Sequence, residues 1–155
     1  MKDARADTVP VAIATGGTLA RFADYVSLTK PRLNVLVVAT SAVGYYLGSS
    51  GRADISTMVE AVVGTALVAA GAAVLNQVSE RDTDRLMRRT RQRPLPTGEL
   101  EASHALTFGI VLNVLAFALL WSAANLLAAA LTLTATLFYV FVYTIWLKPD
   151  RKSVV

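Results

Sequence analysis

The sequence predicts an all-α, polytopic membrane protein, and three observations indicate this fold class. Hydrophobic residues make up 54% of the 155-residue chain, and its mean hydropathy of +0.50 is above that of an average soluble domain. From Ala105 to Leu147 the chain contains no Asp, Glu, Lys or Arg. The apolar segments are continuous rather than alternating, and they are much longer than the ~10 residues of a membrane-barrel strand, so we expect helices.

Four apolar segments are each expected to cross the membrane as a helix, because about 20 helical residues span a hydrocarbon core of ~30 Å. The first segment is short, so its helix is expected to begin earlier, in the interfacial stretch Arg21–Pro31. Only the region around Asn125 separates the third segment from the fourth, which predicts a tight hairpin. The expected spans are Leu33–Gly48, Ser56–Val78, Ser103–Ala123 and Leu126–Leu147.

The basic residues lie between the spans and predict the orientation of the chain. The N-terminal segment, the loop between the second and third spans and the C-terminal tail share one side, whereas the other side has Arg52 alone. Lys and Arg concentrate in cytoplasmic loops, so we expect a multi-pass protein of the cell inner membrane, with both ends and the Arg-rich loop 81–93 in the cytoplasm. Because the net charge of +4 is spread over loops between apolar segments, we do not expect nucleic acid as a partner.

The end of the second expected span carries a polar stripe of Asn76, Glu80 and Asp84. Residues four apart lie on nearly the same face of a helix, whereas Asp82 lies on roughly the opposite side. Carboxylates stacked in this way repel each other, and near hydrocarbon each charge costs about 2.5–3.5 kcal/mol on insertion scales. A bound divalent cation reduces both the repulsion between the carboxylates and the cost of placing their charges near hydrocarbon. The hard oxygen ligands suit Mg²⁺, which uses one or two protein carboxylates together with waters and substrate phosphates.

A basic turn follows the stripe directly, from Arg88 to Gly98. Pro94 and Pro96 cannot continue a helix, so we expect a rigid turn that carries guanidinium groups over the end of the stripe. Arginine matches phosphate oxygens in bidentate geometry, and an acidic stripe beside a basic loop is what an allylic diphosphate needs. The alternative interpretation is that the arginines only set the topology and the acids pair with them at helical spacing.

The segment Asn76–Gly98 resembles the first acidic motif, NxxxDxxxD, of the UbiA superfamily of intramembrane prenyltransferases, together with the RPLPxG sequence of its continuation, which here is Arg93–Gly98. Within that superfamily the chain is similar to the haem farnesyltransferases, because Glu80 and Met87 favour that branch over the quinone branch. Leu28–Arg32 before the first span is also similar to that branch, as is Phe138–Thr144 in the fourth span, followed by Leu147 and Lys148. The resemblance covers nearly all of the chain.

The resemblance implies transfer of the farnesyl group of farnesyl diphosphate to a vinyl group of haem b, which makes haem O for terminal oxidases. It implies Mg²⁺ as the cofactor, farnesyl diphosphate and haem b as substrates, a lipid bilayer around the chain, and haem-pathway proteins or a second copy of the chain as candidate partners. Asn76, Glu80 and Asp84 would be the catalytic and metal-binding residues. The residues implied to bind the diphosphate are Lys30, Arg32, Arg85, Arg88, Arg89 and Arg93.

One departure from the family concerns the length of the chain. The family has about nine transmembrane helices and a second acidic motif, whereas this sequence contains four expected spans and no second motif. We therefore expect part of a UbiA-like helix bundle, with residues 1–24 as an N-terminal cytoplasmic tail and residues 25–155 as a partial prenyltransferase domain that could be inactive alone. Two other functions stay open: a 4-hydroxybenzoate-type aromatic polyprenyltransferase, which shares the RPLP turn, and a non-catalytic membrane protein fragment.

Overall fold

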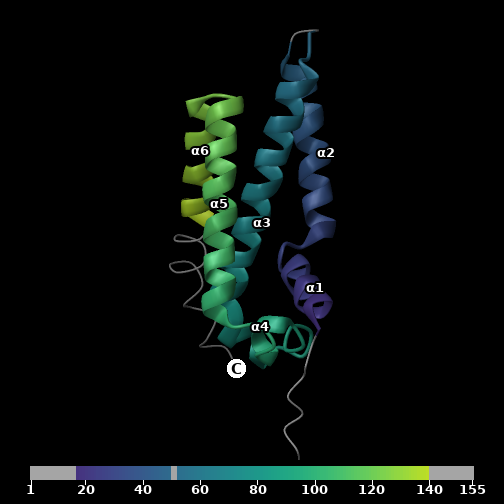
Figure 1. Cartoon of the computed structure of the whole chain (residues 1–155), viewed down its shortest axis with the longest axis vertical. Coiled ribbons are helices and arrows are strands. Elements are labelled where there is room, and N and C mark those ends of the chain that lie inside the picture. Colours follow the sequence, from purple (N-terminus) through teal and green to yellow (C-terminus); the bar gives the residue numbers. More distant parts are fainter. Residues whose placement is uncertain (1–16, 50–51, 140–155) are drawn as a thin grey trace, which may run out of the picture.

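A computed structural model describes residues 17–49 and 52–139 of the chain, and all regular elements among them are helices (Figure 1). The predicted all-α class is therefore confirmed. The elements are α1 (Thr18–Leu28), α2 (Pro31–Gly48), α3 (Ile55–Leu86), α4 (Pro94–Thr97), α5 (Ala102–Ala123) and α6 (Leu126–Leu137).

The long helix α3 is the centre of the arrangement. It packs against α2 on one side and, more extensively, against α5 on the other, and α6 packs beside α5. Figure 1 shows the carboxyl end of α2, the amino end of α3 and the α5–α6 connection at one end of the bundle, and α1 and α4 together at the opposite end. The end of α3 that carries the polar stripe therefore lies next to α1 and α4.

Two of the described helices are long and apolar enough to cross a membrane, Ile55–Leu86 and Ala102–Ser122. They correspond to the second and third expected spans. Helix α2 has 18 residues and α6 has 12 in its described part, and neither meets the same criterion of length and hydropathy. The first and fourth spans therefore stay predictions, and residues 140–147 of the fourth lie outside the described residues.

Small residues let α3 and α5 approach each other closely. A Cβ added at Gly64 would lie 2.6 Å from Cδ2 of Leu120. A Cβ added at Gly71 would collide with the side-chain amide of Asn113 and would lie 3.0 Å from the carbonyl oxygen of Gly109. Such close backbone contact is the usual way in which helices associate in lipid. The close contact with α5 fixes the rotation of α3 about its own axis, and so determines which face of α3 is turned toward α2.

The start of α2 differs from the expectation. The helix does not extend back through the interfacial stretch, because α1 ends at Leu28 and Lys30 adopts a left-handed conformation with φ 49° and ψ 63°. Pro31 explains both facts: a proline disfavours the right-handed helical region for the residue before it, and it is well suited to the first position of a helix. The interfacial stretch therefore forms a separate helix, joined to α2 through a sharp corner.

The carboxyl end of α3 and the basic turn also differ in detail from the expectation. The helix continues eight residues past Val78 to Leu86, so the whole polar stripe is helical. The expected turn is present, but it contains the short helix α4, with Pro94 in its first turn and Gly98 left-handed at its end (φ 84°). Proline is tolerated at that position because the first N–H groups of a helix have no intrahelical partner.

Candidate functional site

The segment that follows α3 folds back onto the end of that helix. Asp84 is 4% exposed, and its Oδ2 accepts a hydrogen bond from Nη1 of Arg93 at 2.8 Å. The hydroxyl of the buried Thr90 donates to the backbone carbonyl of Asp84 at 3.0 Å, which satisfies a carbonyl in the last turn of the helix. These two bonds hold the backbone and the side chain of Asp84 in one place.

A second set of contacts fixes α4 beside α3. Nε of Arg85 donates to the carbonyl oxygen of Pro96 at 3.1 Å. Leu95 is buried in the hydrophobic core together with Leu28 of α1 and Val74 of α3. Burial of apolar side chains is the main source of stability in such a cluster, so the basic turn is packed on both α1 and α3. The arginines of the turn are therefore presented on a fixed backbone.

Lys30 approaches the same region from the corner between α1 and α2. Burial lowers the pKa of its ammonium group, nearby Arg93 lowers that pKa further, and Asp84 opposes the shift by raising it. Lys30 therefore lies within electrostatic range of both members of the Arg93–Asp84 pair. An ammonium group held next to a guanidinium group is repelled by it, so a bound anion would relieve that repulsion.

A polar pocket of about 200 Å³ opens between these elements. Two carboxylates and three basic side chains face one small space, which is suited to an anionic ligand accompanied by a cation. The polar pocket is lined by Lys30, Glu80, Thr83, Asp84, Met87, Arg89, Thr90 and Arg93.

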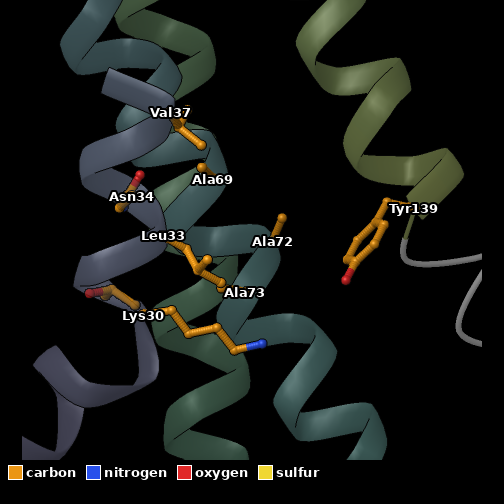
Figure 2. Close-up of a pocket in the computed structure, with 9 residues that line it drawn as sticks. Lys30, Leu33, Asn34, Val37, Ala69, Ala72, Ala73 and Tyr139 are labelled. Atoms are coloured by element: carbon orange, nitrogen blue, oxygen red, sulfur yellow. The ribbon is translucent and has the colours of Figure 1, made fainter. Parts of the chain in front are cut away.

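An apolar pocket of about 300 Å³ lies between α2, α3 and Tyr139, which follows α6 (Figure 2). Figure 2 shows Tyr139 facing Ala72 across this space, with the side chain of Lys30 extending across its lower end. Lys30 lines both pockets, so the two meet at its side chain. A ligand with a charged head and a hydrocarbon tail could occupy both. The apolar pocket is lined by Thr29, Lys30, Leu33, Asn34, Val37, Ala69, Ala72, Ala73 and Tyr139.

The polar pocket brings together five of the nine residues that were expected to bind the metal or the diphosphate, and the other four do not line it. Asn76 is buried on α3 but does not line the polar pocket, and Arg32, Arg85 and Arg88 are exposed outside it. Among the described residues no group of three or more His, Cys, Asp or Glu is arranged to hold a metal ion. The roles assigned to all of these residues stay predictions. The five residues that line the polar pocket are Lys30, Glu80, Asp84, Arg89 and Arg93.

Sequence reasoning missed Thr83, Thr90 and Gln77. Thr83 follows Glu80 by three residues, so helical spacing alone could have placed it on the same face. Its hydroxyl makes no hydrogen bond with the part of the chain that the structure describes. The hydroxyls of the other helical threonines whose side chains are described donate to backbone carbonyls or, at Thr57, to Asp54. Thr83 therefore differs from them in keeping its hydroxyl available at the pocket.

Comparison with known proteins identifies relatives for most of the chain. The model of the UbiA prenyltransferase family matches residues 37–150. Protoheme IX farnesyltransferase from Leptospira biflexa is 47% identical over 126 residues, which are 81% of this chain and 44% of the relative. The protein of that name from Synechocystis is 43% identical over 125 residues, which are 81% of this chain and 40% of the relative. The one from Mycobacterium tuberculosis is 41% identical over 134 residues, which are 86% of this chain and 44% of the relative. The chain spans less than half the length of these relatives. No solved structure matches it.

Proposed function

The chain belongs to the UbiA prenyltransferase family, and from this premise we propose that it forms the diphosphate-binding part of an enzyme that transfers the farnesyl group of farnesyl diphosphate to haem b, producing haem O. The polar pocket is the observation that carries the proposal. It combines the carboxylates of Glu80 and Asp84 with the cationic groups of Lys30, Arg89 and Arg93. The names of the relatives support haem as the acceptor.

Glu80 and Asp84 would hold Mg²⁺ in this pocket. The two carboxylates fit the ion, because Mg²⁺ commonly takes one or two protein carboxylates and keeps its remaining positions for waters and phosphate oxygens. Oδ2 of Asp84 already accepts from a cationic group, at 2.8 Å from Nη1 of Arg93. Bound there, Mg²⁺ would neutralise part of the charge on the diphosphate. Asn76 is the third expected ligand, and its part in metal binding remains a proposal.

The basic side chains would bind the diphosphate and stabilise it as a leaving group. When the bond between the allylic carbon and oxygen breaks, negative charge grows on the diphosphate oxygens. Arg93 is already held by Asp84, so its guanidinium group needs no reorganisation at that moment. Arg89 and Lys30, which line the same pocket, would share this charge. A vinyl group of haem b would then attack the allylic cation, and water would add to the resulting carbocation and lose a proton, which completes the hydroxyethylfarnesyl substituent.

The apolar pocket would hold the first part of the farnesyl chain. Its lining is mainly small or aliphatic side chains of α2 and α3, such as Ala72 and Val37. Lys30 stands where the two pockets meet, so its ammonium group would lie near the link between the hydrocarbon and the diphosphate. A farnesyl chain in an apolar space gains from burial, which helps to orient the scissile bond.

The polar pocket would face the cytoplasm in the cell inner membrane. Figure 1 places α1 and α4 at the same end of the bundle, where the basic residues of the corner and of the turn lie, whereas Arg52 precedes α3 at the other end. An excess of Lys and Arg is typical of the cytoplasmic side. This orientation supports a site open to a water-soluble diphosphate.

Binding of farnesyl diphosphate to the purified full chain in lipid nanodiscs tests the proposal. We expect binding by calorimetry that needs Mg²⁺ and that Asp84→Asn weakens at least tenfold. Asp82→Asn is the matched control, because this neighbouring carboxylate is 81% exposed and its one ion pair within residues 17–49 and 52–139 is with Arg81, at 3.4 Å. Equal losses in the two variants, or binding that is indifferent to Mg²⁺, would contradict the proposal and favour a non-catalytic fragment.

A second titration identifies the acceptor. Haem b is added in the presence of an unreactive farnesyl diphosphate analogue, and its Soret absorbance reports binding. We expect the analogue to tighten haem binding. If the analogue tightens binding of 4-hydroxybenzoate and leaves that of haem unchanged, the chain belongs with the aromatic polyprenyltransferases instead.

A further inference from the structure

A buried glutamine joins α3 to the end of α1. Gln77 is 4% exposed, and its Nε2 donates to the backbone carbonyl of Leu28 at 2.7 Å and to that of Ala73 at 3.3 Å. Leu28 is the last residue of α1, and carbonyls in the last turn of a helix lack intrahelical partners. The side chain of Leu28 is fully buried in the hydrophobic core. Gln77 therefore holds the backbone at the place where α1 ends.

The chain turns sharply two residues later, at Lys30. With φ 49°, Lys30 is the only non-glycine residue with a positive φ among those that the structure describes. This left-handed conformation is uncommon for residues with a side chain, and it persists only where the surrounding structure determines it. Pro31 restrains the corner from one side. From the other side, the bond from Gln77 fixes Leu28 as the point from which the corner starts.

This corner decides where the ammonium group of Lys30 lies. Lys30 lines the polar pocket together with Arg93, whose positive charge repels its ammonium group, and with Asp84, whose carboxylate attracts it. No acceptor for a hydrogen bond from the ammonium group is found in the described part of the chain. The position of the side chain at the pocket therefore depends on the backbone of the corner, and no hydrogen bond of the ammonium group to the described residues fixes it.

We propose that Gln77 is a positioning residue of the diphosphate site: by bonding the carbonyl of Leu28, it fixes the corner that presents Lys30 to the anion. Gln77 itself lies outside both pockets. The inference rests on the proposed function, because it assigns Gln77 a part in the same site. Its consequence is that the contributions of Gln77 and Lys30 to anion affinity depend on each other.

A double-mutant cycle on the full chain in nanodiscs tests this dependence, with Mg²⁺ and farnesyl diphosphate as the probe. Lys30→Met should raise Kd about tenfold, and Gln77→Met, which keeps the volume and removes the donor, should raise it about fivefold. The double variant should bind no more weakly than Lys30→Met alone, because Gln77 acts through Lys30. Gln92→Met, at an exposed glutamine of the basic turn, is the matched control and should leave Kd unchanged.

Two results would overturn the inference: additive effects in the double variant, or an unchanged Kd in Gln77→Met while Lys30→Met weakens binding. If Gln77→Met does not fold, Gln77→Asn replaces it, since its amide is one methylene too short to reach Leu28.

Amide hydrogen exchange without ligand supplies the second measurement. In Gln77→Met, exchange should be faster in the peptide 28–34 and unchanged in α5. A wild-type chain that binds no diphosphate would refute the proposed function. Hydrogen exchange would still show whether Gln77 holds the corner, because unchanged exchange of peptide 28–34 in Gln77→Met would refute the inference on its own.

Discussion

The guanidinium group of Arg93 and the carboxylate of Asp84 form the ion pair that closes the carboxyl end of α3, with Nη1 2.8 Å from Oδ2. The side chain of Asp84 is only 6% exposed, whereas that of Arg93 is 31% exposed. A buried charge that loses its partner is strongly destabilising. Arg93 therefore stabilises the folded turn in addition to its proposed contact with the diphosphate, and the two roles can be separated by substitution.

Arg93→Met should lower the free energy of unfolding by about 1–3 kcal/mol, because it leaves the carboxylate of Asp84 buried without its partner. Adding Asp84→Asn should restore most of this stability, since a neutral amide costs less to bury than a carboxylate. The double variant should still fail to bind farnesyl diphosphate. Denaturant unfolding in mild detergent measures the stability. A double variant that is no more stable than Arg93→Met would show that the ion pair does not stabilise the turn.

Lys30→Met should leave the ligand-free protein as stable as the wild type or more stable at neutral pH, although it weakens anion binding. Burial first, and then Arg93, lower the pKa of Lys30 from 10.5, so folding disfavours the charged form of this side chain. The destabilisation is present below the lowered pKa of the folded state and disappears as the pH rises through it toward 10.5. The melting temperature of Lys30→Met relative to wild type, recorded from neutral to alkaline pH, measures this. A variant clearly less stable at neutral pH would contradict it.

Gly71→Ala should destabilise the chain by about 1–3 kcal/mol, because the added methyl group has no space between α3 and α5. Gly44→Ala is the matched control: nothing lies within 4 Å of a Cβ at that position of α2, so a helix-interior alanine should be neutral or slightly stabilising there. Thermal unfolding of both variants in the same detergent gives the comparison. Equal melting temperatures would mean that the two helices pack less closely than the structure shows.

Asp54→Asn should remove a part of the acid sensitivity of the chain while changing its stability little at neutral pH. Hydrogen bonds from the side chain of Thr57, and then from its backbone N–H, lower the pKa of Asp54 at the amino end of α3. The contribution of Asp54 to folding stability is therefore fully present above 3.8, the pKa of the unfolded state, and it is lost as the pH falls through the lowered pKa of the folded state. Asparagine also caps helices well but does not titrate. Melting temperatures between about pH 6 and pH 3 should show a shallower loss in the variant.

Helical periodicity was sufficient to predict the acidic side of the candidate site. Glu80 and Asp84 lie on one rigid helix, so their spacing in sequence fixes their relative positions, and both line the polar pocket. The position of Arg93 over the end of the stripe was also predictable, because a short turn that contains two prolines has few ways to fold. The ion pair with Asp84 is the direct consequence of that turn.

Periodicity could not show which of the other basic residues line the polar pocket and which lie outside it. Whether an arginine faces the pocket depends on how the turn packs, and Nε of Arg85 bonds the carbonyl of Pro96 eleven residues later. The corner at Lys30 depends on Gln77, which follows Leu28 by 49 residues in sequence. Contacts of this kind leave no periodic pattern in the sequence. They become visible only when the packing of α1, α3 and α4 is known.

Thr83→Val should weaken the binding of farnesyl diphosphate about three- to tenfold, because it removes a hydroxyl that lines the polar pocket and makes no hydrogen bond with the described residues. A hydrogen bond to a charged ligand contributes about 1.5–3 kcal/mol, and water that replaces the hydroxyl recovers part of this. Valine keeps the shape of threonine, so the melting temperature should not fall. Thr107→Val is the matched control, since that exposed hydroxyl donates to the carbonyl of Ser103 at 3.0 Å on α5. Calorimetry measures Kd for both variants. If Thr83→Val binds farnesyl diphosphate as tightly as Thr107→Val does, Thr83 takes no part in the site.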